Sequence, residues 1–467
     1  MIELSLADLA SAVSGAVHAR SGAAAIETVT GPVVVDSRLA TAGCVFIAMR
    51  GETTDGHEFA AAAVESGAAV VIAERDLDLA VPTIVVADSL VALASLAREV
   101  VARVRSDGRL RVVAVTGSNG KTTTKNMLRS VLEQAGSVVS PRGSFNNQVG
   151  APLSMLDVTT ESDFLVVEMG ASAVGDIARL ISIVTPDVAI VLKVGLAHAG
   201  GFGSIEETQK AKAEIVTALP ESAVAVLNTD DSRVGAMAAM TRARVVGFGF
   251  SETAMVRAED VSTTVDGTSF TLVSGDERIR AHVNIIGEHN VMNALATVAA
   301  AKEFGVRAAD AIAALSTLHR AERWRMEVLH APQGITVIND GYNASPDSMA
   351  AALKTLAEIT RGTNRSIAVL GEMAELGEFS DEEHDRIGRL IVRLNIDRLI
   401  VVGHAARHIH NAAGLEGSWD GESVLVQNAD EAYDLLDKEL RSGDVVLVKS
   451  SNSAGLRLLG DRIAGVT

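Results

Sequence analysis

A strand-like run that leads straight into a glycine-rich turn and then into a helix constrains the fold of this chain more than any other feature. Residues 111–115 read Arg-Val-Val-Ala-Val, which is typical of a buried strand, and residues 116–123 read Thr-Gly-Ser-Asn-Gly-Lys-Thr-Thr. Apolar residues then recur at helical spacing, at Met127, Leu128, Val131 and Leu132. This order of elements is typical of α/β folds with a mostly parallel sheet covered by helices on both faces.

The turn has the residue types that bind a nucleoside triphosphate. Glycines let the backbone approach a polyphosphate, and the start of the helix supplies N–H donors. Lys121 would pair with β- and γ-phosphate oxygens, and the Thr122 hydroxyl would bind Mg²⁺. The usual pattern has one more glycine, where this chain has Val115, so the loop is a shortened variant. The residues predicted to bind the nucleotide here are Gly117, Ser118, Asn119, Gly120, Lys121, Thr122 and Thr123.

The length and the pattern changes predict three α/β domains. At roughly 150 residues per domain, 467 residues correspond to about three domains. A polar segment at 105–109 and a break at 318–324 divide the chain into an N-terminal domain at 1–108, a central domain at 109–319 and a Rossmann-like C-terminal domain at 320–467. Alternating strand-like and helical runs fill all three, with a hairpin-like stretch at 263–280.

Composition excludes several classes of partner and site. Lys and Arg total 41 and Asp and Glu total 59, so the formal charge of −18 disfavours nucleic acid and anionic membranes as partners. A single cysteine, Cys44, excludes a disulfide framework and a cysteine-based metal cluster, and we expect it in a core. No signal peptide and no apolar run of about 18 residues is visible, so we expect a cytoplasmic protein without membrane insertion.

Carboxylate and imidazole side chains follow other strand-like runs of the central domain. Glu168 ends the run 164–167, and His198 follows the run 188–194, so both would lie near the glycine-rich turn at the carboxyl edge of a parallel sheet. Both are residue types that bind metal ions, although a surface Glu and a solvated His are equally simple interpretations. Lys212 lies within a helical pattern and, from the residues alone, is a helix-surface lysine.

Several segments taken together resemble the Mur ligases, which are ATP-dependent, amide-bond-forming enzymes of peptidoglycan precursor assembly. The similar segments are 116–123, 144–150, 168–170, 198–203, 227–231 and 287–293. Segments 36–38, 55–59, 340–349 and 370–377 are similar to the branch that adds D-alanyl-D-alanine, and no Asp-Asn-Pro-Arg, expected of the third-residue-adding branch, occurs. The resemblance covers essentially the whole chain.

The resemblance implies a three-domain ligase that joins D-alanyl-D-alanine to UDP-N-acetylmuramoyl-tripeptide through an acyl phosphate. It implies that Thr122 and Glu168 hold one Mg²⁺, and that His198 and a carbamylated Lys212 hold a second. Lys121, Lys212 and His198 would be the catalytic residues. Nucleotide contacts would come from Asn290 and Asn293 at the adenine, Asp340 at the ribose and Arg323 at a phosphate. Substrate contacts would come from Asp36, Ser37, Arg38, His57, Asn146, Asn147, Tyr342 and Asn343.

The chain departs from the family pattern at three places, and other functions stay open at this point. Glu322, Ser345 and Asn452 stand where glycine, asparagine and arginine are usual. The alternatives are a third-residue-adding or folylpolyglutamate-synthase-like ligase, a P-loop phosphotransferase or ATPase of another class, and a catalytically idle homologue. The tripeptide could carry diaminopimelate or lysine as its third residue. We expect a monomer, since separate α/β domains bury their own cores.

Overall fold

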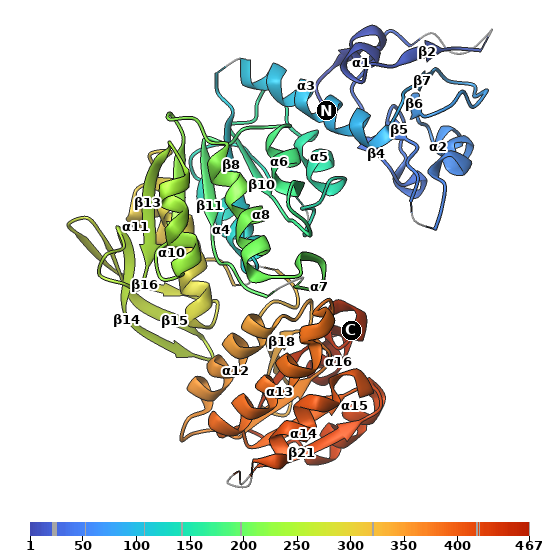
Figure 1. Cartoon of the computed structure of the whole chain (residues 1–467). Helices are drawn as coiled ribbons and strands as arrows, with labels where there is room; N and C mark the ends of the chain where they lie inside the picture. The colour runs from blue at the N-terminus through green and yellow to red at the C-terminus, as the bar shows by residue number, and fades with distance from the viewer. Residues whose placement is uncertain are drawn as a thin grey trace.

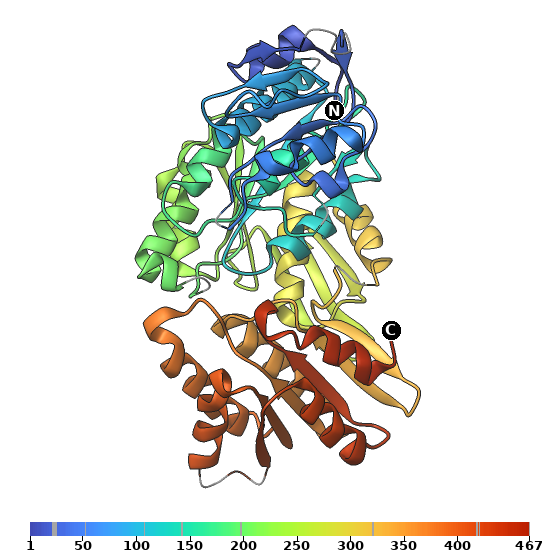
Figure 2. The same ribbon diagram turned by 90° about the vertical axis from the view of Figure 1, so that its right-hand side faces the viewer.

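Three α/β bodies follow one another along the long axis of the molecule (Figures 1 and 2). The structure is a computed structural model that describes residues 1–20, 26–51, 53–106, 108–141, 143–196, 199–319, 322–416, 419 and 421–466. The N-terminal domain lies at one end, the central domain in the middle and the C-terminal domain at the other end. Each large sheet lies within one of the three ranges predicted from the sequence.

The N-terminal domain is built on a five-stranded sheet in the order β2-β7-β6-β5-β4, with a separate pair of β1 and β3. Its strands are β1 Leu4–Ser5, β2 Ala16–His18, β3 Thr28–Val29, β4 Val33–Val34, β5 Val45–Ile47, β6 Val70–Ala73 and β7 Thr83–Val85. Its helices are α1 Leu6–Ala12, α2 Ala60–Glu65 and α3 Ser89–Ser106. Helix α3 leads directly into the central domain (Figure 1).

The central domain has a nine-stranded sheet in the order β16-β15-β14-β13-β12-β11-β8-β10-β9. All neighbours from β9 to β14 are parallel, and β14, β15 and β16 form an antiparallel ribbon, so the mostly parallel sheet and the hairpin are confirmed. The strands are β8 Arg111–Thr116, β9 Val138–Val139, β10 Phe164–Glu168, β11 Val188–Val191, β12 Val224–Asn228, β13 Arg244–Gly249, β14 Val256–Thr264, β15 Gly267–Ser274 and β16 Glu277–Val283.

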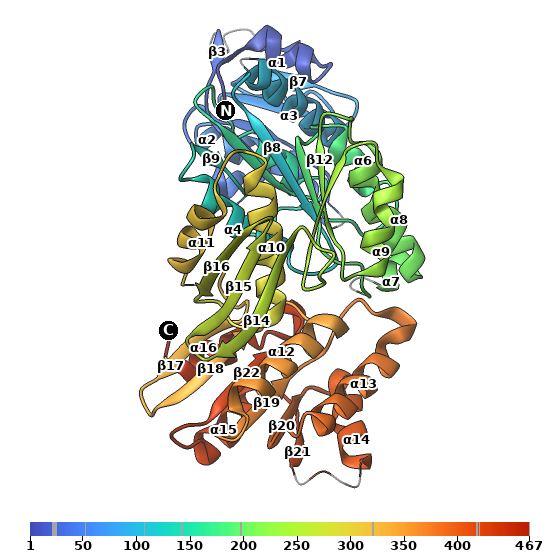
Figure 3. The same cartoon turned by 90° about the vertical axis from the view of Figure 1, so that its left-hand side faces the viewer.

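Eight α-helices belong to the described part of this domain. They are α4 Lys121–Leu132, α5 Gly150–Met155, α6 Asp176–Ile181, α7 Ala199–Phe202, α8 Ile205–Thr217, α9 Ser232–Gly235, α10 Glu288–Lys302 and α11 Ala308–Ser316. Ser204 caps α8 by accepting a hydrogen bond from the Glu207 amide at 3.1 Å, which fixes where that helix begins. The ribbon of β14 and β15 extends toward α12 of the next domain (Figure 3).

The C-terminal domain has a six-stranded sheet in the order β17-β18-β22-β19-β20-β21, in which only β17 is antiparallel. Its strands are β17 Glu327–Ala331, β18 Ile335–Asp340, β19 Ser366–Leu370, β20 Arg398–Val402, β21 Glu422–Val426 and β22 Val445–Lys449. Its helices are α12 Pro346–Thr360, α13 Ser380–Arg393, α14 Arg407–Leu415, α15 Ala429–Glu439 and α16 Arg457–Ala464. The predicted Rossmann-like alternation is confirmed.

Alternation along β8 divides the apolar residues of the central sheet between its two faces. Val112 and Ala114 pack on one face, and Val113 and Val115 pack on the other under α4 and α10. The first of these cores continues through α3 into the N-terminal sheet, so those two domains share one apolar core. Within the described residues, the two cores of the C-terminal domain include a single residue from outside it, Ile286. Cys44 is fully buried, as predicted.

No α-helix within the described residues is long and apolar enough to cross a membrane.

Candidate active site

The glycine-rich loop links β8 to α4 as predicted, and its two glycines have backbone angles that suit no other residue. Gly117 and Gly120 have φ of 151° and 85°. A Cβ on Gly120 would lie 2.4 Å from Oδ1 of Asn293, so α10 packs directly against the loop. The Lys121 ammonium donates to the Gly117 carbonyl at 2.8 Å and curls over the loop. The loop therefore presents an ammonium group and the first amides of α4 on one side.

Glu168 lies beside this loop because β10 pairs with β8 in parallel register. The register places Glu168 opposite Val115, the second-last residue of β8. The Thr122 hydroxyl donates to Oε2 of Glu168 at 3.1 Å, and the Asn146 amide donates to Oε1 at 2.7 Å. Glu168 is 1% exposed. A buried carboxylate facing a hydroxyl supplies two of the oxygen ligands that Mg²⁺ prefers, so the residues present fit this ion.

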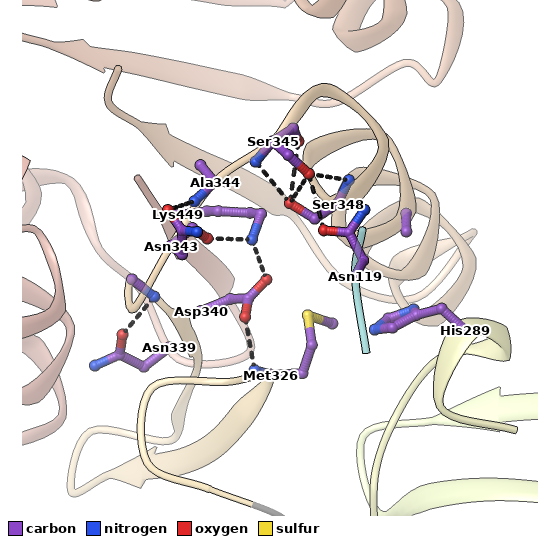
Figure 4. A network of polar contacts seen from close by, with 12 residues as sticks. Asn119, His289, Met326, Asn339, Asp340, Asn343, Ala344, Ser345, Ser348 and Lys449 are labelled. Carbon is purple, nitrogen blue, oxygen red and sulfur yellow. Dashed lines mark hydrogen bonds and ion pairs between the residues drawn. The ribbon is translucent and has the colours of Figure 1, made fainter. Parts of the chain in front are cut away.

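The opposite wall of the site comes from the C-terminal domain, where an acid and a base meet at the ends of two strands (Figure 4). Parallel register between β18 and β22 puts Asp340 opposite Lys449. The Lys449 ammonium contacts Oδ2 of Asp340 at 2.5 Å and donates to the Asn343 carbonyl at 3.0 Å, and the Met326 amide donates to Oδ1 of Asp340 at 3.0 Å. Asp340 is therefore fixed in position by two partners.

A cavity of about 330 Å³ lies between these two walls. It brings together most residues predicted at the nucleotide, with part of the substrate set: Ser118, Asn119, Gly120, Lys121, Thr122, Thr123, Asn146, Glu168, Asn290, Asn293, Asp340, Tyr342 and Asn343. Two contacts join the walls at its edge. The Ser345 hydroxyl donates to Oδ1 of Asn119 at 3.0 Å, and Lys193 pairs with Asp347 at 2.9 Å. The cavity is polar on both sides, as a phosphate-bearing ligand requires.

Buried amides on α10 also line this cavity. Asn293 donates to Oδ1 of Asn290 at 3.0 Å, and Asn290 donates to the Ile286 carbonyl at 2.9 Å. His289 lies beside them, and burial lowers its pKa to about 4, so its imidazole is neutral at pH 7. A second cavity of about 670 Å³ continues from His289 and Asn293 toward Asp231 and Phe248. This is ample space for a planar base next to amide groups.

Lys212 is buried, so the interpretation from the residues alone as a helix-surface lysine is wrong. The side chain is 3% exposed and lines a cavity of about 300 Å³ together with Lys121, Asn146 and Asn147. Burial, and then the charge of Lys121, lower the pKa of Lys212 to about 7. The helical spacing missed this because helix α7 packs against α8, and the centroid of the Phe202 ring at the end of α7 lies 5.7 Å from the Lys212 ammonium.

The remaining predicted metal ligand, His198, lies outside the described residues. Among the residues that are described, no three His, Cys, Asp or Glu side chains gather as a metal-binding group.

Asn147 does not face Glu168 as Asn146 does. Its Oδ1 accepts from the Gly150 amide at 2.8 Å at the start of α5, so it shapes the loop that carries Asn146.

Arg323 does not line the cavity of about 330 Å³ between the two walls. Its guanidinium donates to Oδ2 of Asp461 at 2.9 Å and lies 4.8 Å from the Trp324 ring. Two residues further on, Arg325 lines the cavity instead. Sequence reasoning missed Arg325, because no spacing rule distinguishes alternate arginines in a connecting segment, and it also missed Ser144 and Lys193.

The N-terminal residues predicted at the UDP-sugar form two separate structures. The Arg38 side chain is 86% exposed, and its guanidinium donates two hydrogen bonds to the Asp36 carboxylate. These hydrogen bonds lower the pKa of Asp36 to about 2. Ser37 begins the same short 3₁₀ turn. His57 is instead enclosed: its ring contacts Asp55 at 2.5 Å and accepts from the Glu74 amide at 2.9 Å. Both ring nitrogens of His57 are therefore occupied in this structure, and its contact with a ligand stays a prediction.

Comparison with known proteins decides the family. Three family descriptions match in sequence order: "Mur ligase family, catalytic domain" over residues 32–112, "Mur ligase middle domain" over 115–301 and "Mur ligase, glutamate ligase domain" over 324–452. The UDP-N-acetylmuramoyl-tripeptide–D-alanyl-D-alanine ligase of Mycobacterium tuberculosis is 44% identical over 99% of this chain and 98% of its own length. The chain belongs to the Mur ligase family. The fold and family expected from the sequence motifs are confirmed, and a phosphotransferase of another class is excluded.

Solved structures of Mur ligases have the same fold over their whole length. A MurF of Acinetobacter baumannii has a TM-score of 0.89 at 30% identity and covers 99% of both chains. The MurF ligase of Thermotoga maritima in complex with ADP has a TM-score of 0.82 at 30% identity, covering 94% of this chain and 98% of its own. An ADP-binding relative agrees with the assignment of this protein as an ATP-dependent Mur ligase.

The three residues that depart from the family pattern, Ser345, Glu322 and Asn452, have different surroundings in this Mur ligase. Ser345 caps α12 in a reciprocal hydrogen-bonded box with Ser348 and also holds Asn119 across the domain boundary. The Glu322 carboxylate accepts from the Asn126 amide of α4 at 3.2 Å. Asn452 is exposed at the start of a short 3₁₀ turn. Ser345 therefore does the capping that an asparagine would do, and adds a contact between domains.

Proposed function

We propose that this Mur ligase joins D-alanyl-D-alanine to UDP-N-acetylmuramoyl-tripeptide at the expense of ATP, in peptidoglycan precursor synthesis. The observation that carries the proposal is the match over nearly the full length of both chains to a relative named for that reaction. The cavity supports it, because the glycine-rich loop, the Glu168 carboxylate beside a hydroxyl and the Asp340 carboxylate line one space. We also propose a cytoplasmic monomer, since each domain has an apolar core of its own or shares one within the chain.

The proposed chemistry has two steps. A carboxylate oxygen of the tripeptide attacks the γ-phosphorus of ATP, the bond from that phosphorus to the β,γ-bridging oxygen breaks, and ADP leaves. The amine of D-alanyl-D-alanine then attacks the acyl carbon, a tetrahedral intermediate forms, and inorganic phosphate leaves as the amine loses a proton. Lys121 and the first amides of α4 would stabilise the transferring phosphoryl group, and their common position at the glycine-rich loop supports this role.

Thr122 and Glu168 would hold one Mg²⁺ and His198 with a carbamylated Lys212 a second. When bound, these ions offset the negative charge that the phosphates and the attacking carboxylate bring together. The phosphoryl group and the acceptor carboxylate would occupy the two cavities that share Lys121 and Asn146. Asp340 would contact the ribose, and the Asn290 and Asn293 amides of α10 would contact the adenine; the hydrogen bonds that fix these side chains support this.

Carbamylation of Lys212 is favoured by its surroundings. Within the described residues, no ion pair involves Lys212, and burial makes the protonated amine costly. A neutral amine adds CO₂ and loses a proton, which converts a cation in a dry cavity into a carboxylate-like oxygen ligand. Because only the neutral amine reacts, the carbamate is expected to increase as the pH rises through about 7.

Lys212→Ala is expected to lower the ligation rate by about 10²-fold or more, with partial rescue by a short-chain carboxylate that replaces the missing oxygens. Carbon-13 NMR after incubation with labelled bicarbonate should show a carbamate signal in the unsubstituted protein and none in the variant. Lys210→Ala is the matched control, because Lys210 lies on the same helix but is 64% exposed and pairs with Glu207. A labelled signal that persists in Lys212→Ala would assign the carbamate elsewhere.

Phosphate release with each substrate omitted in turn tests the proposed function. We expect release that requires ATP, Mg²⁺, the UDP-linked tripeptide and D-alanyl-D-alanine together, since the acyl phosphate needs an acceptor to turn over. Colorimetric phosphate detection with a diamino acid in place of the dipeptide is the control. Release that responds to the diamino acid and ignores the dipeptide would place the enzyme in the third-residue-adding branch.

A further inference from the structure

Lys125 lies inside the protein along its whole side chain, one helical turn after Lys121 on α4. It is 0% exposed. Its ammonium donates to the Pro141 carbonyl at 2.6 Å and to the Gly143 carbonyl at 2.9 Å. In the described part of the chain both of its partners are backbone oxygens, and no carboxylate pairs with it. The proposed reaction assigns no role to Lys125, so its burial has another cause.

A buried ammonium group without a carboxylate is costly, and lysine is almost never fully buried unless it is paired. An apolar side chain at this position would leave the Pro141 and Gly143 carbonyls without these hydrogen bonds. Lysine supplies three N–H donors at the end of a long stem, so it reaches both carbonyls from the helix. The residue type therefore suits an anchor between α4 and the chain around Pro141 and Gly143.

The segment that begins at the second of these carbonyls, residues 143–149, has few other attachments. It follows β9, an edge strand of two residues that pairs with β10 alone among the described strands. Within the described residues, no backbone hydrogen bond joins residues 143–145 to the rest of the protein. The next backbone bond is accepted by the Asn146 carbonyl from the Gly170 amide at 2.8 Å. The two bonds from Lys125 therefore hold the start of the 143–149 segment.

The 143–149 segment carries two side chains to the proposed magnesium site. The Ser144 and Thr122 hydroxyls share a hydrogen bond of 2.9 Å, and the Asn146 amide donates to Oε1 of Glu168 at 2.7 Å. The bond from Asn146 orients the Glu168 carboxylate, whose Oε2 accepts from the Thr122 hydroxyl at 3.1 Å. Loss of a group that orients a metal ligand in this way commonly lowers metal affinity or activity by about 10- to 100-fold.

Thr122 and Lys125 therefore reach the same carboxylate from one helix, the first directly and the second through the 143–149 segment. Lys125 lines neither of the two cavities that contain Lys121. We infer that Lys125 is a positioning residue for magnesium binding, because its ammonium ties the 143–149 segment to α4. Asn146 of that segment then holds the Glu168 carboxylate toward Thr122. The inference rests on the proposed function, in which Thr122 and Glu168 hold Mg²⁺.

The test is the affinity for a non-hydrolysable ATP analogue, measured by calorimetry with and without Mg²⁺. Lys125→Met keeps an unbranched stem but loses the N–H donors. We expect the ratio of the two affinities to fall by about fivefold or more, while the affinity without Mg²⁺ changes by less than about twofold. Both affinities come from the same sample, so partial unfolding of the variant does not imitate the effect. Arg129→Met is the matched control, since Arg129 lies one turn further along α4 but is 53% exposed and pairs with Glu133.

Two further measurements test the path through Asn146. The double variant Lys125→Met with Asn146→Ala should have the same affinity ratio as Asn146→Ala alone, within about twofold, because both substitutions release the same carboxylate. Hydrogen exchange followed by mass spectrometry should be faster at the Gly150 and Gly170 amides in Lys125→Met, since both amides bond to the 143–149 segment. Exchange in β12 should stay unchanged.

Should Lys125→Met fail to fold, Lys125→Gln takes its place, because a side chain one atom shorter cannot reach both carbonyls. We then expect the affinity ratio to fall by about threefold or more. An unchanged ratio in the folded variant, additive effects of the Lys125 and Asn146 substitutions, or unchanged exchange at Gly150 and Gly170 would overturn the inference. An unsubstituted protein whose affinity for the analogue does not respond to Mg²⁺ would instead contradict the proposed function, and the exchange result would still decide whether Lys125 anchors the segment.

Discussion

Lys121→Ala is expected to lower the rate of phosphate release with all substrates present by about 10³-fold or more. The Lys121 ammonium donates to the Gly117 carbonyl at 2.8 Å, and Lys121 lines both the cavity of about 330 Å³ and the cavity of about 300 Å³. In the proposed reaction it would stay beside the phosphoryl group as that group passes from ADP to the carboxylate. Burial lowers the pKa of Lys121, the Glu168 carboxylate partly offsets this, and Arg325 lowers it further, so an incoming triphosphate would favour the protonated amine.

Steady-state kinetics at saturating substrates would measure this effect as a loss of kcat. Circular dichroism should show an unchanged fold, because Lys121 lies at the first position of α4 and alanine is a good helix former. Lys210→Ala again serves as the control for removing a lysine from this domain. Near-normal kcat in Lys121→Ala would contradict the assignment of residues 116–123 as the phosphate loop.

Lys449→Met is expected to destabilise the C-terminal domain by about 3–5 kcal/mol, because it leaves the Asp340 carboxylate buried without its cation. Lys449 is 1% exposed and Asp340 is 9% exposed, so water cannot replace the lost partner without opening the site. The two tryptophans of the chain, Trp324 and Trp419, both belong to this domain. Urea unfolding followed by tryptophan fluorescence therefore reports on the domain in question.

A double-mutant cycle separates the interaction energy between Asp340 and Lys449 from the general cost of substituting a buried residue. Asp340→Asn combined with Lys449→Met removes both charges, and we expect the double variant to be more stable than the sum of the single effects by more than about 1 kcal/mol. Lys438→Met, on the exposed side of α15, should change stability by less than about 0.5 kcal/mol. Additive single effects would mean that Asp340 and Lys449 do not stabilise one another.

The sequence predicted the parts of this protein that are contiguous along the chain. The strand, turn and helix at 111–132 could be assigned because every residue of that motif is local and each has a distinct physical reason to be there. Glu168 could be placed near it because parallel strands bring their carboxyl ends to one edge. The family and the D-alanyl-D-alanine branch followed from several such local motifs taken together.

Contacts between distant segments could not be predicted in the same way. Lys212 follows an exposed-face spacing, and it is buried by segments such as α7 that lie outside its own helix. Arg325 lines the cavity, whereas Arg323 is bound by Asp461, which lies 138 residues further along the chain than Arg323. His57 has a residue type typical of ligand contacts, yet its own neighbours Asp55 and Glu74 occupy both ring nitrogens. In each case, a partner that no spacing rule connects to the residue decides its environment.

The N-terminal and central domains share an apolar core, so their junction is harder to separate than the junction between the central and C-terminal domains. Separating the N-terminal from the central domain would expose the apolar face of α3 to water. Separating the central from the C-terminal domain exchanges contacts such as Ser345 with Asn119 and Lys193 with Asp347 for contacts with water, at little cost. We therefore expect domain motion at the junction between the central and C-terminal domains, which is the junction that holds the proposed nucleotide site.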